Sequence, residues 1–382
     1  MRLFVIAGEP SGDALGGALM EGLNEIRPEV TYAGVGGPLM QAQGLTSQFP
    51  MEELSVMGIA EILPKYRHLK RRIREVAEAV ITNQPEALVT IDSPDFCLRV
   101  ARLVKAKCPD LKVIHYVAPT VWAWRPGRAQ KMAEVVDHVL ALFPFEPPYM
   151  VEVGMGCDFV GHPVATAPRA TMEEVAHFRS EHGLTSAAPL VLMLPGSRKG
   201  EVSRLAETFG AVAGQVQKRH PNAHILLPTL SHLRPLIEQL TKDWPMKPLI
   251  LCLDAQTKRI AFAAADVALA ASGTVSLELA AAGTPMVIAY DMNWFSRQII
   301  WRMVRLETVT LVNLVSGTRA VPEFLGADCQ PSLIGPALEK VLEDPTTQTA
   351  AMATTMERLG QGGKPPGKRA AEAVMRVIGA GR

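Results

Sequence analysis

Short runs of apolar and β-branched residues alternate along this chain with longer amphipathic segments. This alternation is typical of βα units around a parallel sheet. In the first half the apolar runs predict strands at 3–7, 31–34, 87–91, 113–117 and 139–142, with a short one near Phe159. In the second half they predict strands at 190–194, 224–227, 249–252, 267–270 and 286–289. The pattern therefore predicts an α/β protein with two similar halves, each a doubly wound sheet.

A proline-containing segment separates the two halves. Gly161-His162-Pro163 and the Thr-Ala-Pro at 166–168 interrupt the pattern before Pro189 introduces the next strand, as expected at a domain boundary. We therefore expect domains over 1–165 and 166–345, a division that a chain of 382 residues can fill. Residues 346–382 predict a C-terminal helical segment that packs back on the first domain or on the partner subunit of a homodimer.

The composition excludes several classes of protein. A formal net charge of +1 and 48% hydrophobic residues do not fit a generally basic nucleic-acid binder or a disordered chain. The start reads as a first strand rather than a signal peptide, and no stretch offers 18 uninterrupted apolar residues, so we expect a cytoplasmic protein without a spanning helix. Five scattered cysteines favour buried reduced thiols over disulfides or a zinc site.

The first strand runs into a glycine-containing loop, Gly8-Glu9-Pro10-Ser11-Gly12-Asp13. Glycines let a ligand approach the backbone, and the N–H groups at a helix start favour anionic or polyhydroxyl ligands. Ser11, Gly12 and Asp13 are therefore candidate substrate-binding residues, although a tight βα turn without a ligand explains the loop equally well. The loop lacks the dinucleotide fingerprint, and no carboxylate follows the second strand, which argues against a nicotinamide dehydrogenase.

Two carboxylates follow the third predicted strand in Ile91-Asp92-Ser93-Pro94-Asp95. Open α/β sheets bind ligands at the carboxyl ends of their strands, and a carboxylate there can serve as general base. The alternative is that Asp92 or Ser93 caps the following helix, with Pro94 in its first turn. We favour the cap for Asp92 and the base for Asp95.

Trp122 and Trp124 follow the fourth predicted strand, beside Arg125. Tryptophan rings stack on sugars or acyl chains and arginine binds phosphate, but a tryptophan pair can equally form a packed corner. The sequence leaves these two interpretations open and gives the segment no catalytic role.

The second half carries two phosphate-binding candidates. Gly196, Ser197 and Arg198 follow its first strand, where backbone N–H groups and a guanidinium can hold a nucleotide diphosphate without a metal or another cofactor. Ser272, Gly273 and Thr274 form a small loop before a helix, which also suits phosphate. Glu278 follows one turn later and could accept both ribose hydroxyls, although an acidic residue there can simply offset the helix dipole.

These blocks together resemble the GT-B glycosyltransferases, and the block at 272–285 resembles their donor-binding block. The remaining motifs resemble the lipid-A-disaccharide synthase family, in order and over nearly the whole chain: GEPSGD at 8–13, the Gly turn at 34–37, Met57-Gly58, IDSPDF at 91–96, HYVAPTVWAWR at 115–125, PFE at 144–146, GHP at 161–163, LPGSR at 194–198 and Asn313-Leu314. The family block often reads Ala-Pro-Asp where this chain has Ser93-Pro94-Asp95.

The resemblance implies two Rossmann-like domains facing a cleft, with the acceptor on the first and the nucleotide sugar on the second. It implies transfer of 2,3-diacylglucosamine from UDP-2,3-diacylglucosamine to the 6-hydroxyl of 2,3-diacylglucosamine 1-phosphate. By position, Asp95 matches the family's proposed base, Arg198 a donor-phosphate residue and Glu278 the ribose-binding acid. Ser11 and Asn313 match further cleft positions. A nucleotide-sugar epimerase, another GT-B transferase and a non-catalytic lipid-binding protein are the alternatives.

Residues 65–74 hold six Lys or Arg and no acid. The apolar residues around them recur at helical spacing and predict an amphipathic helix: Ile62, Tyr66, Leu69, Ile73 and Val76. A solvated basic face is the ordinary interpretation. Acylated substrates must come from a bilayer, however, so we expect peripheral association with the anionic inner membrane through Arg67, Arg71, Arg72 and Arg74.

Overall fold

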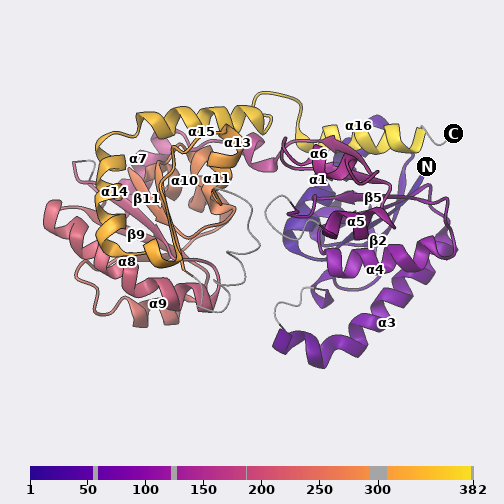
Figure 1. The fold of residues 1–382 in the computed structure, drawn as a ribbon, viewed down its shortest axis with the longest axis horizontal. Helices are drawn as coiled ribbons and strands as arrows, with labels where there is room; N and C mark the ends of the chain where they lie inside the picture. The colour runs from indigo at the N-terminus through magenta and orange to yellow at the C-terminus, as the bar shows by residue number, and fades with distance from the viewer. Residues whose placement is uncertain (55–58, 122–126, 186, 292–307, 380–382) are drawn as a thin grey trace. The chain divides into compact units, whose positions relative to one another are not determined.

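The computed structural model describes residues 1–54, 59–121, 127–185, 187–291 and 308–379, with the side chains of 59–66 left aside. The chain forms two compact units (Figure 1). Unit 1 comprises Met1–Thr166 and Leu359–Arg382, and unit 2 comprises Ala167–Arg358. The sequence placed the division one residue earlier, after 165.

Unit 1 is built on a seven-stranded sheet with the order β3-β2-β1-β4-β5-β6-β7. Its strand pairs are all parallel. The strands are β1 (Arg2–Ala7), β2 (Thr31–Val35), β3 (Thr46–Ser47), β4 (Ala87–Ile91), β5 (Lys112–Tyr116), β6 (His138–Ala141) and β7 (Gly156–Phe159). The helices are α1 (Pro10–Ile26), α2 (Pro38–Ala42), α3 (Ile59–Asn83), α4 (Pro94–Lys105), α5 (Gly127–Ala133), α6 (Pro147–Val151) and α16 (Pro366–Gly379), with short 3-10 turns η1 (Met51–Glu53) and η2 (Pro163–Thr166).

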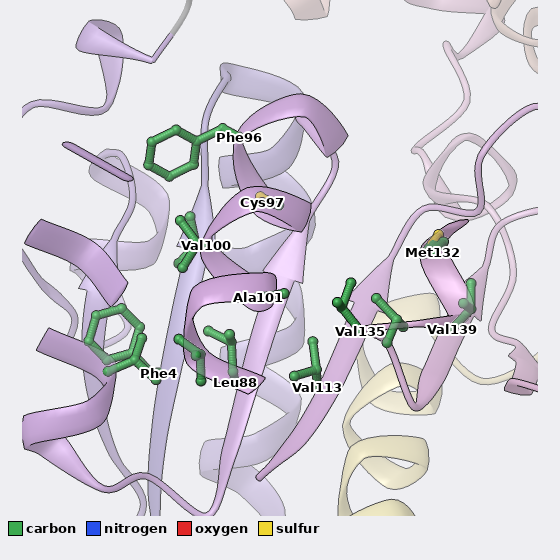
Figure 2. Close-up of a cluster of buried hydrophobic side chains, with 14 of the residues drawn as sticks. Phe4, Leu88, Phe96, Cys97, Val100, Ala101, Val113, Met132, Val135 and Val139 are labelled. Carbon is green, nitrogen blue, oxygen red and sulfur yellow. The ribbon is translucent and has the colours of Figure 1, made fainter. Parts of the chain in front are cut away.

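Buried aliphatic and aromatic side chains join one face of this sheet to α3, α4 and α5. Figure 2 shows Phe4, Leu88 and Val113 pointing from neighbouring strands toward α4. On α4, Phe96 and Val100 recur at the four-residue spacing that places side chains on one helix face. Burying one such side chain contributes roughly 1.5–3 kcal/mol, so this layer fixes where α4 begins relative to the end of β4.

Unit 2 repeats the architecture with a six-stranded parallel sheet, in the order β10-β9-β8-β11-β12-β13. Its strands are β8 (Leu190–Leu194), β9 (His224–Thr229), β10 (Leu249–Cys252), β11 (Val267–Ala270), β12 (Met286–Tyr290) and β13 (Glu323–Leu325). Its helices are α7 (Met172–Glu181), α8 (Lys199–Arg219), α9 (Arg234–Leu240), α10 (Ala255–Ala264), α11 (Val275–Ala282), α13 (Leu311–Ser316), α14 (Pro331–Glu343) and α15 (Thr346–Arg358), with the 3-10 turn η3 (Gly326–Asp328).

The strand order reverses at the same place in both sheets. The first strand of each unit lies between two neighbours: β1 between β2 and β4, and β8 between β9 and β11. The crevice outside the carboxyl ends of the strands at such a reversal is where doubly wound sheets bind ligands. The predicted α/β fold with two Rossmann-like halves is confirmed, and the two reversals position the candidate site of each unit.

The C-terminal segment, which we predicted as one piece over 346–382, divides between the units. Helix α15 packs on α13 and α11 of unit 2, whereas α16 packs on α1 of unit 1. Glycines permit the second contact, because a Cβ on Gly367 would collide with the carbonyl oxygen of Ala18. Lys368 then reaches Glu25 at 2.5 Å. The chain therefore returns to its own first unit after crossing the second.

The predicted strands agree with the structure within one or two residues at each end, and the short strand expected near Phe159 is β7. The sequence missed β3 and β13, which have two and three residues. Both lie at the edge of a sheet, where pairing on one side only leaves a weak hydrophobic signal. Within the described ranges, none of the helices combines the length and apolar character that a membrane span requires.

Candidate functional site

A pocket of about 450 Å³ lies at the carboxyl ends of the strands in unit 2, and we call it the unit 2 pocket. It brings together Gly196, Ser197 and Arg198, which follow β8, with Ser272, Gly273 and Thr274, which follow β11. Glu278, on the first turn of α11, also lines it. All seven unit 2 residues predicted from the two motifs therefore surround one cavity, at the point where the strand order reverses.

Two helices begin at this pocket without a side-chain cap. Arg198 is the N-cap of α8 and Thr274 that of α11, and neither side chain accepts a bond from its helix. The backbone N–H groups of the first turn are then available to an anion, and the helix dipole favours one. The Arg198 side chain is 70% exposed and only loosely paired with Glu201, at 3.4 Å, so its guanidinium can turn toward a ligand.

Gly196 is required by the shape of the first loop. Its φ is +122°, and a Cβ there would lie 2.7 Å from the Cβ of Glu201. Glycine accepts this conformation without strain, whereas another residue would have to push α8 away from the loop. Gly273 in the second loop has a φ of +154°, which also favours glycine, although no atom lies within 4 Å of its Cβ position. Its carbonyl accepts a bond from the Ser276 hydroxyl at 2.9 Å.

Lys258 on α10 also lines this pocket, and the sequence analysis did not identify it. Its ammonium contacts the Glu278 carboxylate at 2.5 Å and lies 5.7 Å from the centre of the Phe262 ring. Glu278 is therefore held by a cation rather than merely offsetting the helix dipole. Lys258 sits in the helical segment after 249–252 with no glycine or motif beside it, so only tertiary structure could place it.

The far wall of the unit 2 pocket is formed by the ends of β9 and β10. Pro228, Thr229, Leu230 and Leu253 line it. The Thr229 hydroxyl is buried and has no hydrogen-bond partner among the residues that the structure describes. Buried polar atoms are nearly always paired, so an unpaired hydroxyl in a pocket wall is a candidate ligand contact. The sequence patterns predicted the strand that ends there but not its part in the pocket wall.

In unit 1 the loops after β1 and β4 lie side by side. Ala7 and Ile91 are partners in the parallel ladder, so Glu9 and Asp92 follow at the same edge. Partial burial and the neighbouring Asp92 carboxylate raise the pKa of Glu9 to about 7. Glu9 was not among the residues selected from the sequence, because a glutamate before a proline carries no motif of its own.

The turn from β4 into α4 is strained. Asp92 has φ +50° and Ser93 has φ +42°, a left-handed conformation that costs non-glycine residues about 1–3 kcal/mol each. Ser93 is the N-cap of α4 but makes no side-chain capping bond, and the Asp92 carboxylate instead accepts from the Ser93 N–H at 2.9 Å. The expected helix cap at Asp92 is therefore wrong, because its side chain is committed to the turn and to Glu9. Asp95 lies exposed in the first turn of α4.

Asp13 and its neighbours are placed differently from what their motif suggested. Asp13 is only 3% exposed, and its carboxylate accepts from the N–H groups of Gly37, Leu39 and Met40 at 2.8–3.0 Å. This carboxylate closes the start of α2, so the structure gives Asp13 a structural role, and its assignment as a substrate contact stays a prediction. Gly12 is buried in the same helix, whereas Ser11 is exposed.

Asn313, which the sequence predicted as a cleft residue, is also buried. It is 2% exposed, and its amide is hydrogen-bonded inside unit 2. The amide N–H group donates to the Val321 carbonyl at 2.9 Å and to the Thr308 hydroxyl at 3.2 Å, while its oxygen accepts from the Val321 N–H at 3.0 Å. Asn313 therefore ties α13 to the segment before β13. Met57, Gly58, Trp122, Trp124 and Arg125 lie outside the described residues.

The basic helix expected at 65–74 is part of α3, and its charges differ in role. Arg72 is a structural residue: it donates to both carboxylate oxygens of Glu53, at 2.8 and 2.9 Å, and lies over the Phe49 ring at 4.2 Å. It is thereby removed from the expected membrane contacts. Ile73 and Val76 are buried in the unit 1 core. Among the side chains of this segment that the structure describes, four other cations are exposed, at the i, i+3, i+4, i+7 spacing of a single helix face: Arg67, Lys70, Arg71 and Arg74.

Comparison with known proteins agrees with this geometry. A family model described as Lipid-A-disaccharide synthetase matches residues 3–377. The lipid-A-disaccharide synthase of Ruegeria pomeroyi is 59% identical over 98% of this chain and 95% of its own length. That of Rhodospirillum centenum is 45% identical over 99% of this chain and 95% of its own.

Solved structures with a similar fold are much more distant in sequence. A putative UDP-N-acetylglucosamine 2-epimerase from Listeria monocytogenes has a TM-score of 0.65 at 12% identity, covering 99% of this chain and 96% of its own. The UDP-GlcNAc 2-epimerase from Neisseria meningitidis bound to UDP-GlcNAc has a TM-score of 0.62 at 10% identity, with both chains covered fully. At such identities the likeness shows the GT-B fold alone, because one fold serves many reactions. The full-length match to the family model and the close relatives confirm the resemblance read from the motifs: the chain belongs to the lipid-A-disaccharide synthase family of glycosyltransferases.

Proposed function

We propose that this protein transfers 2,3-diacylglucosamine from UDP-2,3-diacylglucosamine to the 6-hydroxyl of 2,3-diacylglucosamine 1-phosphate, with inversion at the transferred carbon. The products are the β-1,6-linked lipid A disaccharide 1-phosphate and UDP. The observation that carries this proposal is the unit 2 pocket, where two uncapped helix starts, an exposed guanidinium and an acidic residue meet. The proposal that both sugars are acylated glucosamines rests on membership of the lipid-A-disaccharide synthase family.

The unit 2 pocket suits a nucleoside diphosphate. The loops at Gly196–Arg198 and Ser272–Thr274 offer backbone N–H groups to the two phosphates, and Arg198 offers a charge-assisted bond. Glu278 accepts the ribose hydroxyls while Lys258 keeps it in place. Thr229 and its neighbours then face the base. The epimerase from Neisseria meningitidis, which shares the fold, is bound to UDP-GlcNAc, and this supports a UDP-sugar as donor.

Asp95 is the base of the proposed reaction. The oxygen of the acceptor's 6-hydroxyl attacks the anomeric carbon, the bond from that carbon to the diphosphate oxygen breaks, and the hydroxyl proton passes to Asp95. An exposed carboxylate in the first turn of α4 can reach an incoming hydroxyl without rearrangement. Ser11, exposed at the start of α1, is the other unit 1 residue that we assign to the acceptor side.

The leaving UDP is stabilised by Arg198 and the two helix starts rather than by a divalent cation. Positive charge placed where negative charge develops lowers the barrier whether it comes from a metal or from protein groups. We therefore expect turnover without an added metal. The functional assay should be run with and without a chelator to check this.

Acceptor and donor both carry acyl chains, so we place the enzyme on the cytoplasmic face of the inner membrane. The basic stripe of α3, defined as Arg67, Lys70, Arg71 and Arg74, is the surface we assign to anionic lipid. Each cation near an anionic surface contributes on the order of 1 kcal/mol, so four on one helix face can hold the protein there reversibly.

The experiment that tests the proposed function is UDP release from UDP-2,3-diacylglucosamine, measured with and without the acceptor lipid and with and without EDTA. We expect release that depends on the acceptor, a product with the mass of the disaccharide 1-phosphate, and no effect of the chelator. An epimerase would convert the donor without the acceptor, and a lipid-binding protein would release no UDP. A strict requirement for magnesium or manganese would contradict the metal-free mechanism alone.

A further inference from the structure

The pairing of Glu9 with Asp92 has no part in the proposed chemistry, yet it joins the two loops at the strand reversal of unit 1. We infer that Glu9 is a positioning residue: its protonated carboxyl donates a hydrogen bond to Asp92 and thereby holds the left-handed turn that places Asp95 at the start of α4. This inference rests on the proposed function for the role of Asp95, but the hydrogen bond between Glu9 and Asp92 can be tested without it.

The loops that follow β1 and β4 lie close together. Ala7 and Ile91 are partners in the parallel ladder, so both loops begin at the same edge of the sheet. A Cβ on Gly8 would lie 2.5 Å from the Ser93 hydroxyl oxygen, so the loops are in contact at the residue next to Glu9. A change at Glu9 is therefore transmitted directly to the turn at Asp92 and Ser93.

The left-handed turn at Asp92 and Ser93 must be held by its surroundings. Two successive non-glycine residues in the left-handed region do not persist unless their surroundings hold them there. On the backbone side, the Asp92 N–H donates to the Tyr116 carbonyl at 3.0 Å. The Asp92 carboxylate also accepts from the Ser93 N–H, and it acts on the Glu9 carboxyl of the neighbouring loop. A hydrogen bond from Glu9 would therefore support a turn that ends two residues before Asp95.

A hydrogen bond between Glu9 and Asp92 requires a proton on one of the two carboxyl groups. Two carboxyl groups can share a hydrogen bond only when one of them is protonated. Asp92 is the ionisable group whose charge acts on Glu9 within the described part of the chain. Around Asp92, the His115 imidazole on β5 and the Cys97 thiol on α4 are buried and neutral, since burial lowers the pKa of His115 to about 4 and raises the pKa of Cys97. Asp13 on α1 is occupied by the start of α2.

The consequence is a dependence on pH with a stated sign. The pKa of Glu9 is raised to about 7, so Glu9 keeps its proton below that pH and loses it above. The hydrogen bond is then replaced by repulsion between two carboxylates, and the turn relaxes. We expect kcat to fall as pH rises through this range, while the KM for the donor stays unchanged because the unit 2 pocket holds none of these residues.

The test combines kinetics with a direct titration of Glu9. Glu9→Gln keeps a hydrogen-bond donor but cannot ionise, so we expect its kcat to stay level from pH 6 to 8.5, where the wild type falls about tenfold. Glu9→Ala removes the donor and should have a low kcat throughout. Glu21→Gln, an exposed glutamate on the same helix α1, is the matched control and should follow the wild type.

Carboxyl-carbon NMR on glutamate-labelled protein, with Glu9→Gln to assign the signal, follows Glu9 itself. We expect its midpoint near pH 7 and a return toward the ordinary glutamate range in Asp92→Asn. A normal midpoint in the wild type, or a decline of kcat near pH 7 that persists in Glu9→Gln, would overturn the inference. If the titration shows the pair while Asp95→Asn retains full turnover, the assignment of Asp95 fails and the hydrogen bond between Glu9 and Asp92 stands.

Discussion

The Lys258 ammonium contacts Oε2 of Glu278 at 2.5 Å across the floor of the unit 2 pocket. Because Lys258 lies on α10 and Glu278 on α11, this ion pair fixes the direction of the carboxylate that we assign to the ribose. Both side chains are about two-fifths exposed, so the pair itself adds little to stability. The main effect of the ion pair is to orient the Glu278 carboxylate.

Replacing Glu278 with Gln should therefore weaken UDP binding without unfolding the protein. Loss of hydrogen bonds to a charged acceptor costs about 1.5–3 kcal/mol, which corresponds to a rise in Kd of roughly 10- to 150-fold. Isothermal titration with UDP measures it. Glu238→Gln, in the exposed pair with Arg234, is the matched control and should bind UDP as the wild type does. Equal affinity in both variants would exclude Glu278 from the nucleotide.

A methyl group at Gly196 should damage the same pocket. Gly196→Ala must place a Cβ 2.7 Å from Glu201 at a φ of +122°, so we expect a loss of about 1–3 kcal/mol in unfolding free energy and at least tenfold weaker UDP binding. Denaturant unfolding and UDP titration check the two effects. Gly200→Ala, four residues on in α8 with no atom near its Cβ position, should be neutral or slightly stabilising. Similar behaviour of the two variants would contradict the steric argument.

Asp95→Asn should separate binding from turnover. The side chain is exposed and makes no hydrogen bond or ion pair with the residues that the structure describes, so folding and UDP affinity should be nearly unchanged. Removal of a general base lowers turnover by a factor on the order of 100 or more. Rates of UDP release measure the loss, and Asp110→Asn, an exposed aspartate elsewhere in unit 1, serves as control. If Asp95→Asn keeps most of its turnover while Asp92→Asn loses it, the base is Asp92.

The basic stripe of α3 should govern binding to anionic membranes. Changing Arg67, Lys70, Arg71 and Arg74 to Ser should reduce sedimentation with phosphatidylglycerol liposomes at least tenfold, and raised salt should do the same to the wild type. Arg72 is left intact because its loss would release α3 from Glu53. The matched control changes four exposed cations of unit 2 to Ser: Lys218, Arg219, Lys242 and Lys247. Equal sedimentation of both variants would rule out the stripe as the contact.

His115 should make the protein less stable in mild acid. It is 1% exposed beside Thr90, and burial lowers its pKa to about 4 from an ordinary 6.5. Between pH 6.5 and pH 4, His115 is therefore protonated in the unfolded chain but neutral in the folded chain. The unfolding free energy consequently falls as pH drops through this range, by up to about 1.4 kcal/mol per pH unit. Denaturant unfolding at pH 7 and pH 5 should show a smaller difference in His115→Gln. An identical pH dependence would mean that His115 is charged in the folded protein.

The strands and the two phosphate loops could be predicted because their signals are local. A buried parallel strand must be continuously apolar, and the loop after it must carry glycine where φ is positive, as at Gly196 and Gly273. The edge strands β3 and β13 lack that signal, since neither is long enough to show a pattern.

The roles of single polar residues could not be predicted in the same way. Asp13 and Asp92 stand in similar glycine- or proline-containing loops, yet one closes the start of α2 and the other pairs with Glu9. Arg72 and Arg71 are neighbours in one basic run, but only Arg72 meets Glu53. Which partner each of these side chains meets depends on what the folded chain brings beside it.

The two α/β halves, the boundary near residue 166 and the loops that follow β8 and β11 could be predicted from residue patterns, because apolar periodicity and glycine act over a few residues. The folded chain was needed to show that α15 and α16 belong to different units, that Lys258 holds Glu278, and that Asn313 is buried. These outcomes depend on contacts between segments that are distant in sequence. Burial and pairing are properties of the packed chain, and a pattern of residue types does not specify them.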